Sequence, residues 1–264
     1  MRITKAKILR IAQTSINENP LQSMLEELNA PEWTTDAKSD GETLIEAAGR
    51  LCYKSFAVGL NPNVTKVREG NHEYIGNILK QRHGSVLEHG SVTYACLNVS
   101  RVFTHELVRH RVASFSQESL RFVRLTDLGA YYPDVFDAHP QKHRIHQMFK
   151  ATFEMLEGIQ RNISDLLDLD NKNLPFDVKK KLTSAMRRLA PIGLTTNIIV
   201  TANHRMWRHM IEMRTSPGAE EEIRKIFTII AEDLKLEFPA IYQDMERLID
   251  ADDIPYYTFK SGRV

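Results

Sequence analysis

The stretch from Arg109 to Phe122, RHRVASFSQESLRF, places the strongest constraint on how this chain can fold. It holds three arginines, one histidine, one glutamate and three serines within fourteen residues. Few of these groups can be buried without partners, because an unpaired charge is costly to remove from water. The fold must therefore keep the stretch at the surface or in a polar site. Arginine stays charged and presents a planar fork to phosphate, so the chemistry points to a bound polyanion.

Net charge limits the kind of anion. The 264-residue chain carries a formal charge of only +1, which excludes a global field toward nucleic acid or anionic membrane. Residues 101–124 are locally basic, with five arginines against two glutamates, a net of +3. Arg109-His110-Arg111 taken alone is also typical of a solvated basic loop, and only the longer stretch favours a site. A small bound anion is therefore favoured over an extended nucleic-acid track.

Composition and targeting signals indicate a cytoplasmic protein. Hydrophobic residues make up 42% and charged residues 26% of the chain, as in ordinary globular proteins. No run is apolar for the length of a membrane span, and the first residues lack the apolar core of a secretion signal. Cys52 and Cys96 have neither metal-ligand spacing nor a disulfide framework, so we expect packed or reduced thiols.

Helical periodicities and β-branched runs predict one α+β domain over residues 1–264, a β-sheet flanked by many helices. Strands are expected at 7–12, 91–98 and 195–201. Helices are expected at 43–51, 71–81, 99–110, 143–169, 177–189, 203–214 and 220–238. Gly84 is expected to end the second helix, and residues 20–41, 114–121 and 125–140 to be irregular. The twelve glycines form no GxGxxG or GxxxxGK[ST] loop, so a nucleotide would be held by side chains and helix ends.

Two further polar clusters accompany the arginine-rich stretch. Residues 203–214, NHRMWRHMIEMR, place Arg205 and His209 four apart on one helical face. Alone, this pattern is also that of an amphipathic helix with a charged solvent face. Residues 83–89, HGSVLEH, contain two histidines and a glutamate, but structural zinc usually recruits cysteine, so we predict no metal.

In order and spacing, these clusters resemble the flavin-dependent thymidylate synthases from about Trp33 to Ile223. The pieces are Ala48-Gly49-Arg50 with Cys52-Tyr53, then residues 83–89, then Thr104-His105-Glu106-Leu107 leading into RHR, seven residues, and Ser-x-Arg; Arg187 to Pro191 and residues 203–214 follow. The resemblance implies a non-Rossmann flavin fold, FAD as cofactor, dUMP as substrate, and NADPH and methylenetetrahydrofolate as co-substrates. It also implies a homotetramer whose active sites are shared between subunits.

The resemblance assigns individual residues. FAD would be bound by Ser85, Arg109, His110, Arg111, Glu118, Asn203, Arg205 and His209. The nucleotide dUMP would be bound by Glu106, Arg109, Glu118, Ser119, Leu120, Arg121, Arg187 and Arg214. His83 would lie near the flavin and folate. Arg214 would be the catalytic residue, stabilising negative charge on the uracil ring, where a fixed guanidinium is effective. Cys52 and Cys96 match no nucleophile motif, and the flavin would carry the hydride chemistry.

Two departures from the family pattern leave alternatives open. A family histidine near Gly218 is absent from Thr215-Ser216-Pro217-Gly218-Ala219-Glu220, and Phe122 stands where an aromatic hydroxyl often follows Arg121. The first departure concerns folate or nicotinamide use, so a related enzyme such as a dUMP hydroxymethylase is an alternative. A non-catalytic nucleotide- or RNA-binding module is a second alternative, although no stripe of stacking aromatics accompanies the arginines.

Overall fold

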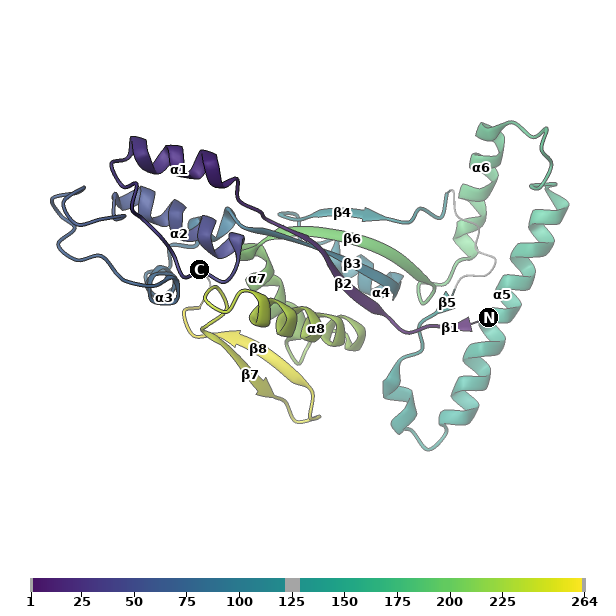
Figure 1. Ribbon diagram of the computed structural model, residues 1–264. Coiled ribbons are helices and arrows are strands. Elements are labelled where there is room, and N and C mark those ends of the chain that lie inside the picture. Colours follow the sequence, from purple (N-terminus) through teal and green to yellow (C-terminus); the bar gives the residue numbers. More distant parts are fainter. Residues whose placement is uncertain (1, 122–128, 263–264) are drawn as a thin grey trace. The chain divides into compact units, whose positions relative to one another are not determined.

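The computed structural model describes residues 2–121 and 129–262 and combines helices with β-sheets (Figure 1). The chain divides into two compact units. The first unit consists of Met1–Leu9, Ala95–Arg109 and Phe115–Val200; the second consists of Arg10–Tyr94, His110–Ser114 and Thr201–Val264. The expected mixture of helix and sheet is confirmed, whereas a single domain over the whole chain stays a prediction.

The strands form three sheets. The largest has the order β2 (Lys7–Gln13), β3 (Ser91–Ser100), β6 (Thr195–Asn203) and β4 (Ser114–Gln117), and each of these strands has residues in both units. A small parallel pair joins β1 (Arg2–Ile3) to β5 (Gly129–Ala130). An antiparallel hairpin joins β7 (Met245–Ile249) to β8 (Pro255–Phe259), with Met245 opposite Phe259. The three expected strands are thereby confirmed.

The helices α1 (Glu18–Glu27), α2 (Asp40–Tyr53), α3 (Asn71–Lys80), α7 (His204–Thr215) and α8 (Glu221–Glu237) belong to the second unit. Its core is built on one face of α8, where five large apolar side chains are buried: Ile223, Ile226, Phe227, Ile230 and Leu234. Trp207 of α7 meets Tyr94 edge to face at 5.2 Å, and its indole N–H donates to the Val92 carbonyl at 3.2 Å. This packing fixes α7, which carries several predicted site residues.

The first unit contains α4 (Arg101–Leu107), α5 (Lys142–Leu166) and α6 (Phe176–Met186), and the Gln160 side chain of α5 donates to the Met186 carbonyl at the end of α6 at 3.4 Å. The apolar side chains along α5 are only partly covered. Phe153 is buried, Phe149, Leu156 and Ile163 are half-buried, and Ile159 is exposed. Short 3₁₀ helices are η1 (Gly84–Glu88) and η2 (Asp134–Ala138), with η3 (Arg187–Leu189) continuing α6.

Several expectations from the sequence were wrong in detail. Helix α1 occupies a region expected to be irregular, because Pro20 falls in its first turn, where proline is tolerated. The second expected helix ends at Lys80, followed by Arg82 at φ 58°, so Gly84 starts η1 instead of ending α3. Strand β4 lies in an expected loop, and the β7–β8 hairpin was not anticipated.

Candidate active site

The segment Arg109-His110-Arg111 forms a turn that exposes its two arginines and buries the histidine between them. Helix α4 ends at Leu107, earlier than predicted, and the Ala113 N–H donates to the His110 carbonyl at 3.2 Å. Arg109 and Arg111 are exposed, whereas His110 is only 5% exposed. In a turn, two exposed side chains can flank a buried one over three consecutive residues. In a helix, the same three side chains would point about 100° apart around the axis.

His110 holds the predicted catalytic arginine. The Nε of Arg214, near the end of α7, donates to Nε2 of His110 at 2.8 Å, and the His110 ring meets the His209 ring edge to face at 5.8 Å. Burial lowers the pKa of His110 to about 4, with further contributions from the charges of Arg214 and His209. His110 is therefore neutral near pH 7 and accepts a hydrogen bond from Arg214.

A cavity of about 290 Å³ in the second unit brings together residues from the predicted flavin site. Its walls include Asn203, Arg205 and His209, together with Val112, and the same cavity reaches Phe259 and Gly262. Asn203 is the N-cap of α7, where its side chain accepts from the Met206 N–H at 2.9 Å, instead of lying within the helix as predicted. Phe259 is the last residue of β8, in a hairpin that the sequence pattern did not reveal.

Glu88 links two of the sequence clusters. Its carboxylate forms an ion pair with Arg205 at 2.5 Å, and both residues line the cavity. Ser85 is exposed on the same 3₁₀ helix, η1. His83, just before η1, faces Tyr53 instead of Glu88. Across residues 2–121 and 129–262, no group of three His, Cys, Asp or Glu side chains is arranged to hold a metal ion.

Arg208 has a structural role within the polar α7 sequence. Its guanidinium is buried, donates to both carboxylate oxygens of Asp244 at 2.7 and 2.9 Å, and donates to the Ile241 carbonyl at 2.8 Å. It also lies over the Phe259 ring at 4.0 Å. Arg208 therefore anchors α7 to the C-terminal segment. The amphipathic interpretation of this helix is too simple, because its charged residues include a buried structural pair.

The predicted dUMP residues Glu106, Arg109, Glu118, Ser119, Leu120, Arg121 and Arg187 belong to the first unit, whereas Arg214 belongs to the second. Glu118 receives hydrogen bonds from the Asn197 side chain at 2.7 Å and from its backbone N–H at 3.1 Å. Ser119 accepts from the Arg121 N–H at 3.2 Å, which shapes the turn that presents Arg121. Phe122, the second departure from the family pattern, lies outside the described residues.

The remaining members of this group differ in exposure. Arg187, in η3, is exposed, and Glu106, in α4, is half-buried. Leu120 packs against the apolar cluster of Ala130, Phe153 and Leu194, so its side chain serves the core.

Arg101 belongs to the basic patch of residues 101–124 but was not predicted as part of the site. Its Nη2 donates to the Glu118 carbonyl at 3.2 Å. Burial lowers the pKa of Arg101, the Glu118 carboxylate opposes that shift, and the nearby Arg187 charge adds to it. Arg101 thus interacts with both Glu118 and a second guanidinium, that of Arg187, and neighbouring guanidinium groups suit an anion.

Comparison with known proteins matches this chain to one family. The family described as thymidylate synthase complementing protein matches residues 35–240. A flavin-dependent thymidylate synthase of Corynebacterium diphtheriae is 34% identical, covering 84% of this chain and 86% of the relative. The enzymes of the same name from Mycobacteroides abscessus and Mycobacterium avium are each 36% identical, covering 84% and 83% of this chain and 86% and 85% of the relatives.

Proposed function

The chain belongs to the thymidylate synthase complementing protein family, and from that premise we propose that it is a flavin-dependent thymidylate synthase. It converts dUMP to dTMP, with methylenetetrahydrofolate as the carbon donor and NADPH as the reductant. The structural observation that carries the proposal is the Arg214–His110 pair, with His209 against it and the cavity at His209.

Arg214 supplies fixed positive charge for the reacting base. The methylated carbon of uracil becomes nucleophilic when negative charge builds up on the ring, and a preorganised guanidinium favours that charge. The neutral His110 holds Arg214 through Nε, so the guanidinium needs no reorientation during reaction. The dUMP phosphate suits Arg121 and Arg187, with Ser119 as a further ligand and Glu106 and Glu118 nearby.

FAD fits the donor set of the second unit. Arg205 can pair with phosphate, and Asn203, His209 and Ser85 add hydrogen-bonding groups, with His110 and Arg111 following Arg109 in the turn. When bound, FAD supplies the hydride chemistry of the reaction. The cavity of about 290 Å³ is just below the range for ligand pockets, roughly 300–1,000 Å³, so it suits part of a dinucleotide. No glycine-rich loop is needed, in keeping with a non-Rossmann flavin fold.

We propose that the enzyme is a homotetramer with shared active sites. Helices α5 and α6 expose large apolar side chains, among them Leu166 at 85% and Phe176 at 66%. Apolar surface of this kind is typical of protein interfaces. Sedimentation of Leu166→Glu should show a smaller species than the wild type, whereas Leu236→Glu, on the equally exposed Leu236 of α8, should not. Equal mass for both variants would contradict the placement.

We propose that the enzyme is located in the cytoplasm. Among the helices in the described part of the chain, none is long and apolar enough to cross a membrane. Cys96 is buried, which raises its pKa to about 12, and Cys52 is an exposed free thiol. The cytoplasmic location stays a prediction.

The visible absorption spectrum, recorded with and without dUMP, tests the proposal first. Flavin bands that shift on adding dUMP would place both ligands in one site, whereas a colourless protein that takes up no FAD would overturn it. Mass spectrometry of the nucleotide product then separates methylation from hydroxymethylation, which adds one oxygen. Gly218 lies where the family pattern has a histidine. It is exposed, and a Cβ added there would meet no atom within 4 Å, so packing does not require a glycine at this position.

A further inference from the structure

An acidic residue, Glu118, directly precedes the nucleotide turn, residues 119–121, in which Ser119 and Arg121 are proposed ligands of the dUMP phosphate. A carboxylate at this position repels a phosphate, because two negative charges then lie close together. Glu118 is exposed, so packing in the core does not account for it. A glutamate that weakens phosphate binding by its charge must contribute in another way, and its contacts indicate how.

Three hydrogen bonds join Glu118 to Asn197 of β6, and this arrangement is the Asn197–Glu118 clamp. The Asn197 side-chain amide donates to Glu118 Oε1 at 2.7 Å, and the Asn197 backbone N–H donates to Glu118 Oε2 at 3.1 Å. The Glu118 backbone N–H donates in return to the Asn197 carbonyl at 3.0 Å. Both carboxylate oxygens are therefore directed to one residue of the strand that neighbours β4.

Asn197 is fixed from its other side by β3. Its Oδ1 accepts from the Asn98 backbone N–H at 2.9 Å. Asn98 has φ 55°, in the left-handed region that asparagine tolerates better than most residues. Because the Asn98 N–H requires an oxygen on its side, the amide nitrogen of Asn197 faces Glu118. Asn197 is thus oriented before any ligand binds.

The nucleotide turn lies between two anchors in the first unit. On one side the Glu118 carbonyl accepts from Arg101 Nη2 at 3.2 Å, in addition to the clamp. On the other side Leu120 packs into the apolar core. Between them, Ser119 Oγ accepts from the Arg121 N–H at 3.2 Å. A turn that is already fixed loses little conformational freedom when a ligand binds.

We infer that Asn197 and Glu118 are positioning residues for the nucleotide phosphate: the clamp holds Ser119 and Arg121 in the geometry that binds it. The inference rests on the proposed function, in which these two residues contact dUMP. Glu118 then acts through its neighbours in the turn, and the geometry that it imposes outweighs the repulsion from its charge.

Exchanging the donor and the acceptor of the clamp tests this role. Asn197→Asp keeps the side-chain size and the acceptor for Asn98, but it turns a carboxylate oxygen toward Glu118. Glu118→Gln keeps the side-chain length, but an amide accepts only one of the two hydrogen bonds that the carboxylate accepts. The double variant restores the pair, because the new glutamine can donate to the new aspartate and still accept from the backbone N–H at position 197.

Kinetics of dTMP formation at varied dUMP, on the flavin-loaded enzyme, measure the effect. We expect KM to rise about tenfold or more in Asn197→Asp and by a smaller factor in Glu118→Gln. The value of kcat should change by less than about twofold, because the phosphate is not the reacting part of dUMP. A purely electrostatic role of Glu118 predicts the opposite sign, since Glu118→Gln removes a negative charge beside the phosphate.

The double variant carries the net charge of the wild type, and its KM should return to within about threefold of the wild-type value. A KM equal to the product of the two single effects would mean that the two residues act independently, and would overturn the inference. A KM lowered by Glu118→Gln, or left unchanged by Asn197→Asp, would contradict it as well.

Asn171→Asp is the matched control in the first unit. The Asn171 side chain accepts from the Asn173 N–H at 2.9 Å and donates to the Asp168 carboxylate at 2.7 Å, as Asn197 does with its own partners. This change should lower stability and leave the KM for dUMP unchanged, and an equal rise in KM would refute a specific role of the clamp. Absence of flavin, or of a dUMP-dependent spectral shift, in the wild type would instead overturn the proposed function.

Discussion

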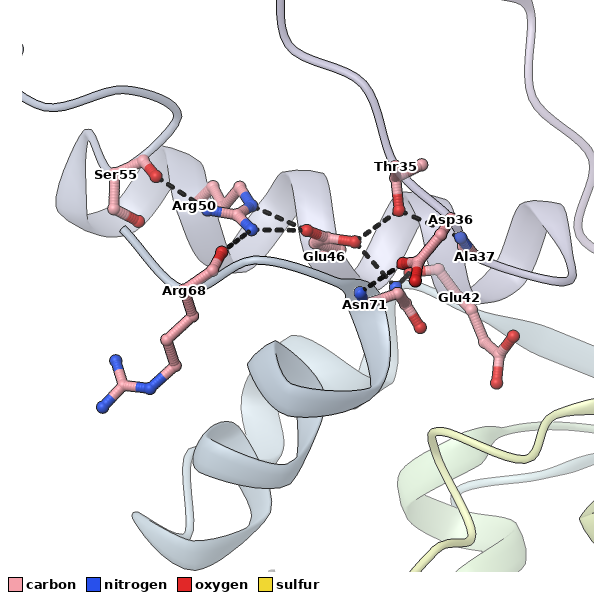
Figure 2. Close-up of polar contacts among 9 residues, drawn as sticks. All are labelled: Thr35, Asp36, Ala37, Glu42, Glu46, Arg50, Ser55, Arg68 and Asn71. Carbon is pink, nitrogen blue, oxygen red and sulfur yellow. Dashed lines mark hydrogen bonds and ion pairs between the residues drawn. The ribbon is translucent and has the colours of Figure 1, made fainter. Parts of the chain in front are cut away.

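Arg214 and Arg50 show two uses of a guanidinium in one unit of the protein. Arg214 is half-buried, and its Nε donates to the neutral ring of His110. Arg50 is buried and faces the carboxylate of Glu46 (Figure 2), so its charge is neutralised within the protein. A guanidinium positioned by a neutral group can act on a ligand, whereas one paired with a buried carboxylate holds structure.

The role of Arg214 predicts a severe loss of activity on truncation. Arg214→Ala should lower kcat by about a hundredfold or more, in the range found when one preorganised transition-state donor is removed, and should also weaken dUMP binding. Steady-state kinetics and the dUMP-dependent flavin spectrum measure both effects. His110→Asn serves as the companion variant, since it frees Arg214 without removing the charge and should cost less. Full activity of Arg214→Ala would exclude its catalytic assignment.

The Glu46–Arg50 pair predicts a stability effect of a different kind. Glu46→Gln keeps the side-chain shape but leaves the buried Arg50 charge unpaired, which should lower the free energy of unfolding by about 3–5 kcal/mol. Urea unfolding measures the loss. The double variant Glu46→Leu, Arg50→Met removes both charges and should lose less than the sum of the single changes. Strict additivity would show that the two groups are not coupled.

At the scale of elements, the start of β3 and the start of α7 meet at Gly90. The His204 N–H donates to the Gly90 carbonyl at 2.9 Å, and the buried His204 ring lies against Gly90. A Cβ at Gly90 would lie 2.7 Å from His204 Cδ2 and 3.1 Å from Ile45 Cδ1. This close approach fixes the beginning of the helix that carries Arg205, His209 and Arg214.

Gly90→Ala should therefore destabilise the protein by about 1–3 kcal/mol, the usual cost of overpacking a core. The matched control is Gly158→Ala in α5, where an added Cβ would meet nothing within 4 Å. That change should raise stability by up to about 1 kcal/mol through helix propensity. Chemical unfolding of both variants gives the comparison, and shifts of the same sign would show that the Gly90 contact is not tight.

At the scale of the whole molecule, two buried histidines link stability to pH. Burial is the main cause that lowers the pKa of His110 to about 4 and that of His204 to about 3, against an ordinary value of 6.5. The unfolded chain therefore binds protons that the folded chain does not, below pH 6.5 and down to the folded pKa values. Stability is unaffected by these groups above about pH 7 and falls as the solution becomes more acidic.

The expected slope is up to about 1.4 kcal/mol per pH unit for each histidine between pH 6.5 and pH 4. Urea unfolding at a series of pH values measures it. His110→Asn removes one of the two titrating groups, so it should lower the slope of stability against pH by up to about 1.4 kcal/mol per pH unit. A stability that stays constant from pH 7 to pH 4.5 would mean that neither histidine is protonated preferentially in the unfolded chain.

How much of this protein could be predicted from its sequence depends on how local each feature is. The strands expected at 7–12, 91–98 and 195–201 and the helix expected at 220–238 follow from side chains that repeat at fixed intervals, and the structure confirms them. The clusters around Arg109, Arg205 and His83 were likewise visible as charge concentrations and as a family resemblance. Such features depend on neighbours in the chain, and a pattern records them directly.

Tertiary structure decided the pairings between distant residues. No periodicity shows that Arg214 rests on His110, that Arg205 pairs with Glu88, or that Arg50 ties Ser55 to Arg68. The same holds for Arg208, a charged residue that becomes part of the core through Asp244, and for the β7–β8 hairpin. A charged residue looks the same in the sequence whether its side chain faces water, a ligand or a buried partner. Its surroundings after folding determine which of these roles it takes.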